Sequence, residues 1–142
     1  ADKPLQAFQH FHQRYKLMLM AKSNKAYREL GRLVASATRD NLEQVMQTYF
    51  DKFMRTMAII PRRGHHVNVL QHVMGYLKKD IDTTDKAELL DWLDDYRQCR
   101  VKRETPMMLL KHHLRRNPKQ YIAAQYYFAP YPVQLATPDT SP

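Results

Sequence analysis

The sequence predicts an all-α protein, a single-domain bundle of about seven helices. Three observations support this prediction. Apolar residues recur at spacings of three and four along most of the chain, the alternation typical of strands is hard to find, and there are only 3 glycines among 142 residues. A chain of this length usually forms one domain. We expect the helical domain to span residues 1–132 and residues 133–142 to form a disordered tail.

Three helices are predicted in the first half of the chain, each with one apolar stripe. The first spans residues 5–22, the second spans residues 24–38, and the third starts near Asp40. Ser23 is placed to cap the second helix, and Asp40 to cap the third, where Glu43 completes a box-like start. The stripes consist of Phe8, Phe11, Tyr15 and Met18, of Tyr27, Leu30, Val34 and Ala37, and of Val45, Tyr49, Phe53 and Met57.

The fourth and fifth helices are predicted after Pro61. The fourth spans residues 65–79, and the fifth starts at Asp82 or Thr83. Each again has an apolar face. The expected inward residues are Val69, Val73 and Leu77 in the fourth helix and Leu89, Leu93 and Tyr96 in the fifth.

Two similar start signals predict the sixth and seventh helices. Pro106 follows Thr105, and Pro118 follows Asn117; proline is tolerated at the first helical position, where its missing N–H has no partner to lose. The residues expected to pack inward are Met107, Leu110 and Leu114, then Tyr121, Ile122, Gln125 and Phe128.

The charge of the chain is strongly basic and unevenly placed. The formal net charge is +9. Residues 80–95 contain seven acids and one lysine, whereas residues 97–119 contain eight lysines or arginines and one glutamate. Such a basic block is either a solvated face or a site for a polyanion, and both interpretations stay open from the sequence.

Cysteine usage and hydropathy limit the class of protein. Cys99 is the only cysteine, which excludes an intrachain disulfide and a thiolate metal cluster and predicts a reducing, cytoplasmic location. Cys99 continues a helical pattern, so we expect a structural thiol. There is no run of about 18 apolar residues, so no membrane partner is expected.

The most informative segment spans residues 62–79. A basic turn containing Arg62 and Arg63 leads into a helix N-terminus, where free N–H groups and the helix dipole favour an anion. Arginine can also grip phosphate with two parallel hydrogen bonds. Asn68 and Gln71 follow and could contact bases. In the alternative interpretation, these two side chains brace neighbouring loops, while His66 and His72 cap buried carbonyls.

The sixth helix predicts a second basic surface. Lys111 and Arg115 are four residues apart, as are His112 and Arg116, so each pair shares a stripe. Tyrosines follow, and cations with exposed rings are typical of single-stranded nucleic-acid surfaces. Of these tyrosines, Tyr121 is expected in the core with its hydroxyl at the rim, while the places of Tyr127 and Tyr131 stay open. The predicted nucleic-acid-binding residues are Arg62, Arg63, His66, Asn68, Gln71, His72, Lys78, Lys79, Arg100, Arg103, Lys111, Arg115 and Arg116.

Three other functions were weighed against nucleic-acid binding. A zinc site could use His65, His72 and either His12 or His113, but no fixed-spacing ligand motif is present, so we expect no metal and no cofactor. An enzyme, which is not the favoured interpretation, could have a pocket lined by His66, Asn68, His72 and His12. A protein-interaction module could pair the acidic fifth helix and the basic sixth helix with the opposite charges of a twin subunit, which would make a homodimer, or of a partner enzyme.

Several short stretches of the chain stand in a specific order and spacing. These are residues 11–16, Leu19-Met20-Ala21, Ser23, residues 27–35, residues 62–79, residues 86–90, Tyr96-Arg97, Pro106, Leu109-Leu110, Tyr121, Gln125 and Pro130-Tyr131-Pro132. In this order and spacing, the chain resembles the YbgA-like bacterial domain family along nearly its whole length. Lys22 departs from the family pattern, because relatives often carry histidine there, and this argues against a metal or acid–base role at this position.

The resemblance implies a link to thiolated nucleosides. Many such domains are fused to a desulfidase-like domain that uses a cysteine-held iron–sulfur cluster on thiolated pyrimidines. The present chain lacks those cysteines and looks like the stand-alone form. The resemblance therefore implies an accessory domain that holds RNA, with transfer RNA as the expected class and a desulfidase-like enzyme as an expected partner.

Overall fold

The computed structural model describes residues 2–128, and this part of the chain is built from helices without a strand. It confirms the predicted all-α class. The predicted tail at residues 133–142, the domain boundary at residue 132 and Tyr131 lie outside the described residues. The helices are α1 (Lys3–Lys22), α2 (Asn24–Ser36), α3 (Leu42–Met57), α4 (Arg63–Tyr76), α5 (Thr83–Arg97), α6 (Glu104–Arg116) and α7 (Gln120–Ala123), followed by the short 3-10 helix η1 (Tyr126–Phe128).

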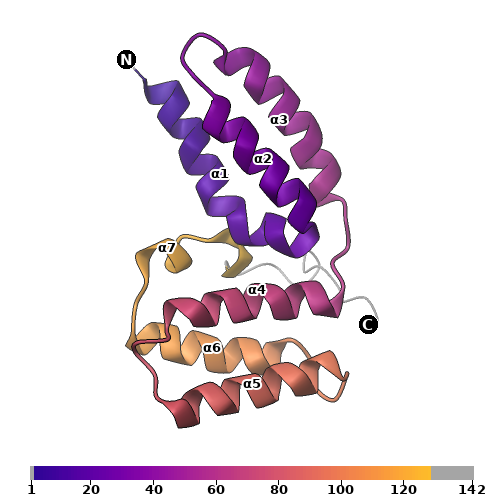
Figure 1. The fold of residues 1–142 in the computed structure, drawn as a ribbon, viewed down its shortest axis with the longest axis vertical. Coiled ribbons are helices and arrows are strands. Elements are labelled where there is room, and N and C mark those ends of the chain that lie inside the picture. The colour runs from indigo at the N-terminus through magenta and orange to yellow at the C-terminus, as the bar shows by residue number, and fades with distance from the viewer. Residues whose placement is uncertain (1, 129–142) are drawn as a thin grey trace.

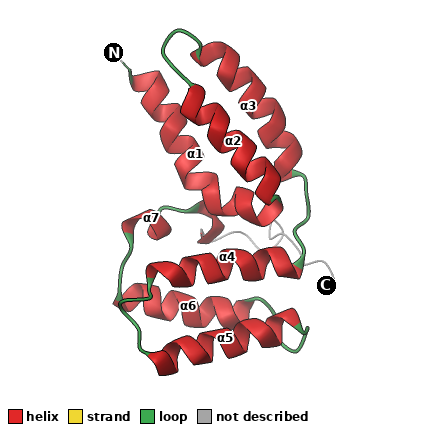
Figure 2. Cartoon of the chain, in the orientation of Figure 1, coloured by secondary structure: helices red, strands yellow, loops and turns green. Residues whose placement is uncertain are grey.

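The helices form two packed groups (Figures 1 and 2). Helices α1, α2 and α3 lie side by side in one group, and α4, α5 and α6 lie across the lower end of that group as a second layer. The junction of α1 and α2 meets α4, and η1 packs against α1. The two groups therefore meet where α1 ends.

Two apolar cores correspond to these groups, and α1 contributes to both. Phe8 and Leu19 of α1 pack with Tyr49 and Phe53 of α3 in the upper core. The lower core takes a different face of α1 and fills the space above α4–α6. Its buried members are Leu17, Met20, Ala21, Val69, Leu70, Val73, Leu77, Ile81, Leu89, Leu93, Leu110, Ile122 and Tyr127. The predicted stripes of the fourth and fifth helices are thus confirmed as inward faces.

Of the two predicted N-terminal caps, Ser23 is confirmed, and Asp82, one of the two residues expected to start the fifth helix, also caps its helix. The Ser23 hydroxyl accepts a hydrogen bond from Ala26 N at 3.1 Å, and the Asp82 carboxylate accepts one from Asp85 N at 2.8 Å. The predicted Asp40 cap is wrong, because α3 starts one residue later. Asn41 is its N-cap and does not cap the helix with its side chain, which instead bonds Thr38 N at 2.6 Å.

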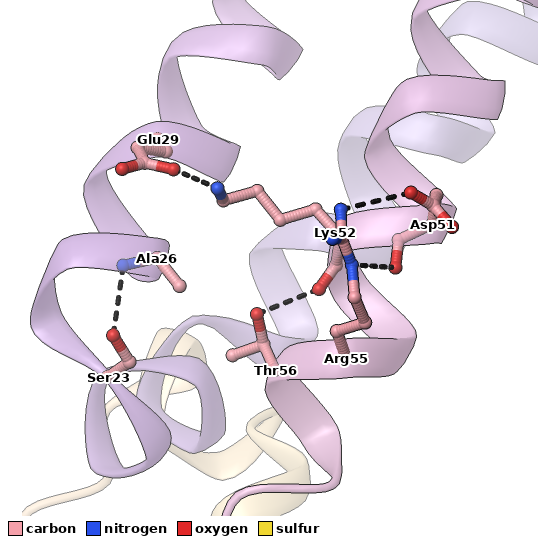
Figure 3. A network of polar contacts seen from close by, with 7 residues as sticks. All are labelled: Ser23, Ala26, Glu29, Asp51, Lys52, Arg55 and Thr56. Atoms are coloured by element: carbon pink, nitrogen blue, oxygen red, sulfur yellow. Dashed lines mark hydrogen bonds and ion pairs between the residues drawn. The ribbon is translucent and has the colours of Figure 1, made fainter.

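Polar contacts join α2 to α3 (Figure 3). Lys52 of α3 reaches across to form an ion pair with Glu29 of α2. On α3 itself, Thr56 donates to the backbone carbonyl of Lys52 at 2.8 Å, and Arg55 pairs with Asp51 at 3.0 Å. The first contact crosses between helices, whereas the other two stay within α3.

The predicted seventh helix is shorter than expected. It has only the four residues of α7, and η1 follows after a break at Gln125. The Gln125 side chain is 2% exposed; its Oε1 accepts from Leu17 N at 3.0 Å, and its Nε2 donates to Gln13 O at 2.6 Å. A regular α-helix pairs N–H groups with carbonyls four residues earlier, so Gln125 binds both members of such a pair on α1. This long-range contact competes with continued helix, and local spacing does not reveal it.

Cys99 was predicted to continue a helix, and this prediction is wrong. The residue is exposed, follows the end of α5 and has a φ of 63°, in the left-handed region. Cys99 N donates to Tyr96 O at 3.0 Å and Arg100 N donates to Asp95 O at 2.8 Å. These two bonds define a Schellman C-cap, whose left-handed position is usually glycine.

No helix in residues 2–128 is long and apolar enough to cross a membrane.

Candidate functional site

Most of the predicted site residues lie near the two opposite ends of α4, and three more lie on its outer face. Helices α4 and α6 run in the same direction in Figure 1, so their N-terminal ends lie together and their C-terminal ends lie together. Because α4 has 14 residues, its two ends are about 20 Å apart. The sequence predicted two basic surfaces, one over residues 62–79 and one over residues 97–119, and the structure brings parts of both together at each end of α4.

The first group, which we call the basic cluster, consists of Lys22, His66, Arg103 and Tyr127. His66 on the first turn of α4 is 3% exposed. Its Nδ1 lies 2.6 Å from the Tyr127 hydroxyl of η1, and its Nε2 lies 2.5 Å from Nη1 of Arg103, at the start of α6. Lys22, at the end of α1, is 5% exposed.

The protonation of His66 follows from these contacts. A guanidinium can only donate, so Nε2 accepts from Arg103 and the ring proton resides on Nδ1, which donates to Tyr127. Burial, together with the charges of Arg103, Lys22 and His65, lowers the pKa of His66 to about 3. His66 is therefore a neutral ring near neutral pH and holds the Arg103 side chain in place.

The two arginines of the predicted phosphate-gripping turn are separated in role. Arg62 is exposed, whereas Arg63 is half-buried. Arg63 Nη1 donates to Tyr96 O at 3.4 Å, and its guanidinium lies 5.1 Å from the centre of the Tyr96 ring. Arg63 thus has a partner on α5, and the paired phosphate grip expected of Arg62 and Arg63 stays a prediction.

Arg100 is held by its own helix end. Its Nη1 lies 3.0 Å from Asp95 Oδ1 and 3.9 Å from Asp94 Oδ2. These carboxylates offset the charge of Arg100. Of the two predicted cations Arg100 and Arg103, only Arg103 contacts a member of the basic cluster.

The second group surrounds what we call the basic groove, between α6 and α7. The groove has a volume of about 410 Å³. Its lining combines an apolar floor with cations at the rim, and Lys119 at this rim is paired with Asp80 at 2.7 Å. The lining residues are Lys111, Leu114, Arg115, Pro118, Lys119, Ile122, Ala123 and Phe128.

Aromatic rings lie at the same end of the molecule as the basic groove. Tyr76 at the end of α4 stacks on Tyr121 of α7 with ring centres 5.6 Å apart, and His72 meets Tyr76 edge-on at 5.8 Å. Burial raises the pKa of Tyr121 to about 12, as expected for a half-buried ring. Lys78 and Lys79 are exposed in the turn that follows α4.

The outer face of α4 presents Asn68, Gln71 and His72. All three are exposed, and none hydrogen-bonds to another residue in the described part of the chain. The alternative in which Asn68 and Gln71 brace loops and His72 caps a carbonyl is therefore not supported. His66 does not cap a carbonyl either, because its ring nitrogens bond the side chains of Tyr127 and Arg103.

The histidines do not converge. His12 hydrogen-bonds the Tyr49 hydroxyl at 2.9 Å in the upper core, far from the exposed His72, and His66 belongs to the basic cluster. Among the described residues, His12 and His66 thus belong to different groups, and Asn68 and His72 are exposed on the outer face of α4. Within residues 2–128, no three His, Cys, Asp or Glu side chains are grouped as metal ligands.

Lys22 and Tyr127 were not predicted as site residues from the sequence. Lys22 lies four residues after Met18 and so continues the apolar stripe of α1 into the interior. A lysine at the end of an apolar stripe was the sequence signal that could have indicated a buried charge at this position. Tyr127 is 8% exposed and bonds His66, so it does not serve as a free stacking ring.

Sequence comparison places this all-helical chain in a known family. Residues 16–132 match the family described as "Protein of unknown function (DUF1722)", and the chain belongs to this family. It is similar to the "Uncharacterized protein YbgA" of Escherichia coli (strain K12), with 32% identity over 123 residues, which cover 86% of this chain and 73% of that protein. The predicted resemblance to the YbgA-like family is confirmed. No solved structure matches the chain.

Proposed function

We propose that the chain binds RNA at the basic groove. The observation that carries this proposal is a groove of about 410 Å³ with an apolar floor and with Lys111 and Arg115 at its rim. Both rim residues are exposed, and neither forms an ion pair with another residue of the described chain. An unstacked base fits an apolar floor, and the adjoining phosphates fit the free cations.

The surrounding residues extend this surface. Lys78 and Lys79 follow α4 at the same end, and Arg116 is exposed at the end of α6. The stacked pair of Tyr76 and Tyr121 offers a ring face of which Tyr76 is 40% exposed. The polar outer face of α4 leads away from this end and would contact sugar or base edges further along the strand.

The expected RNA class is transfer RNA, and the expected role is that of an accessory domain. Both expectations, and that of a desulfidase-like partner, depend on the resemblance to domains linked with thiolated nucleosides. The expected cytoplasmic location depends instead on the single cysteine. The groove itself favours a single-stranded loop or end, because bases within an RNA duplex are not accessible to such a floor.

Salt dependence is the first measurement. If about five phosphates are contacted, the logarithm of the binding constant should fall with the logarithm of salt concentration with a slope of about −4. Fluorescence anisotropy with a labelled transfer RNA, between low and physiological salt, gives this slope. A flat response would contradict binding through phosphate contacts.

A paired variant locates the binding surface. Lys111→Glu with Arg115→Glu should weaken RNA binding at least tenfold, because it replaces two rim cations with anions. The matched control is Arg28→Glu with Arg32→Glu, an exposed pair with the same spacing on α2. Equal losses in both variants would show that only the total charge matters, and the groove would not be the site.

A second candidate is a protein-interaction module. It is favoured by exposed apolar residues on adjacent helices, Leu90 of α5 at 47% and Met108 of α6 at 68%, beside the acids of α5. Light scattering at low and high salt tests the predicted homodimer. A monomer under both conditions would contradict that self-association.

A further inference from the structure

A second groove, which we call the α1–α2 groove, lies between the first two helices, which run side by side in Figure 1. Its volume is about 540 Å³, a size typical of sites for small molecules. It shares no lining residue with the basic groove between α6 and α7. Any ligand of the α1–α2 groove is therefore bound independently of the proposed RNA surface.

His12 is the one buried residue in the lining of the α1–α2 groove, with 3% of its surface exposed. Its Nδ1 hydrogen-bonds the Tyr49 hydroxyl at 2.9 Å, whereas its buried Nε2 has no hydrogen-bond partner in the described chain. Burial, followed by the charge of Lys16, lowers the pKa of His12 to about 4, so the ring is neutral near neutral pH. One nitrogen of a neutral ring donates and the other accepts, so Nε2 retains an unused hydrogen bond, which is unfavourable for a buried atom.

Gly31 of α2 lies opposite this nitrogen. A Cβ at Gly31 would stand 4.0 Å from His12 Nε2 and would meet no other part of the chain outside its own stretch of helix within 4 Å. Close packing of the two helices therefore does not require a glycine here. Glycine inside a helix is less stable than alanine, so Gly31 is unfavourable for α2 but leaves the space beside Nε2 open.

Three cations surround the groove, Lys16 of α1 and both Arg28 and Arg32 of α2. The two arginines are exposed and four residues apart, a spacing at which like charges on a helix repel each other. None of the three cations forms an ion pair within residues 2–128. An anion in the groove would relieve this repulsion.

The one acid on α1 and α2 is Glu29, and it is paired elsewhere. It forms an ion pair with Lys52 of α3 (Figure 3). The hydrogen bond from Lys52 lowers the pKa of Glu29, and the charge of Arg32 adds to this effect without an ion pair. No acidic residue lines the α1–α2 groove, whereas Tyr27 and Val34 add an apolar surface to it.

We propose that the α1–α2 groove binds a small organic oxyanion, that is, a phosphate or carboxylate group carried by an apolar ring-sized body. The oxyanion lies between Arg28 and Arg32, since guanidinium groups donate paired hydrogen bonds to either group. The body lies over Gly31 and presents a polar atom to His12 Nε2. Because Nε2 is covered in the free chain, the long Lys16 side chain at the rim moves aside as the ligand enters.

Calorimetric titration of the whole chain at constant ionic strength tests the proposal with two probes, naphthyl phosphate and naphthylacetate. At least one probe should bind about tenfold more tightly than inorganic phosphate, which lacks the body, and than naphthalene methanol, which lacks the charge. A preference for naphthyl phosphate would support a phosphate ester as the ligand, and a preference for naphthylacetate would support a carboxylate. If neither probe binds more tightly than both controls, the proposal is overturned.

Gly31→Ala separates ligand binding from a structural role. It should raise the dissociation constant of the preferred probe about tenfold, because the methyl group takes the space beside Nε2, and yet it should raise the midpoint of thermal unfolding. Gly75→Ala changes an exposed glycine of α4 with open space around it, and should bind the probe as the wild type does. Unchanged affinity in Gly31→Ala would overturn the proposal.

A pair of double variants tests the charges. Arg28→Gln with Arg32→Gln should raise the dissociation constant of the probe about tenfold or more, because two hydrogen-bonding cations are lost. Lys111→Gln with Arg115→Gln, an exposed pair with the same spacing on α6, should leave it unchanged. Equal losses in the two variants would mean attraction by total charge alone and would overturn the proposal.

The NMR signals of the histidine ring nitrogens report the contact directly. The Nε2 signal of His12 should shift when the probe saturates the chain, because a new hydrogen bond forms there. His10, exposed on the same helix and outside the groove lining, is the control and should not shift. An unshifted Nε2 signal of His12 at saturation would overturn the proposal.

Discussion

His12 and His66 are buried histidines that stay neutral in the folded protein. Burial and the nearby Lys16 charge lower the pKa of His12 to about 4, and that of His66 is about 3. In the unfolded chain both return to about 6.5. Between these values, the unfolded state takes up protons that the folded state does not, so acid favours unfolding.

We predict that the free energy of unfolding is constant above about pH 6.5 and falls as the pH is lowered towards 4. Each histidine contributes up to about 1.4 kcal/mol per pH unit in this window. Urea denaturation at several pH values measures the slope. His12→Gln should reduce it, whereas His10→Gln, at an exposed position, should not. An unchanged slope in His12→Gln would contradict the assignment.

Cys99 gives a second prediction at the scale of one residue. Its left-handed φ of 63° is unfavourable for a side chain with a Cβ. Cys99→Gly should raise the free energy of unfolding by about 0.5–1 kcal/mol, after the entropic cost of glycine in the unfolded chain. Urea denaturation measures the gain. Cys99→Ala keeps the Cβ and should show none, and equal stability of the two variants would argue against backbone strain.

The junction of α1 and α2 depends on Ser23, which ends one helix and caps the next. We predict that Ser23→Ala lowers the free energy of unfolding by about 1 kcal/mol, because Ala26 N loses its side-chain acceptor. Thermal unfolding followed by circular dichroism gives the difference. Ser23→Asp should retain most of the stability, and Asn24→Ala, at the exposed first residue of α2, should change little. A loss in Asn24→Ala as large as in Ser23→Ala would remove the special role of the cap.

At the scale of elements, the first six helices follow from local signals. Apolar stripes and the caps Ser23 and Asp82 place their ends to within a few residues, because these signals act through neighbours in sequence. The seventh helix could not be predicted, since Gln125 is drawn to a backbone pair more than a hundred residues away. The prediction that Cys99 continues a helix was wrong, because a helix C-cap formed there without glycine.

The candidate site was predicted less well than the fold. The residue types at Arg62, Arg103 and Lys111 indicated basic surfaces, but spacing along the chain does not say which side chain turns inward. His66 binds Arg103, the N-cap residue of α6, and is buried, whereas Asn68 on the same helix is exposed. Only the packing of α4 against α1 and α6 decides this division.

At the scale of the whole molecule, Gln125 connects the C-terminal segment to α1, the helix that both cores share. We predict that Gln125→Leu lowers the free energy of unfolding by about 1–3 kcal/mol, because two buried hydrogen bonds are lost. It should also speed hydrogen exchange at the Leu17 amide. Gln120→Leu, exposed on the same segment, is the control. Unchanged protection of Leu17 would mean that the amide contact is dispensable.

The Gln125 contact also constrains how the length of α1 can vary among related chains. It engages the turn from Gln13 to Leu17, and Lys22 follows within the same helix. One inserted or deleted residue between Leu17 and Lys22 would rotate the ammonium by about 100° around the axis, away from Arg103. Insertions before Gln13 would leave that angle unchanged. Length variation in homologues should therefore be confined to the part of α1 that precedes Gln13.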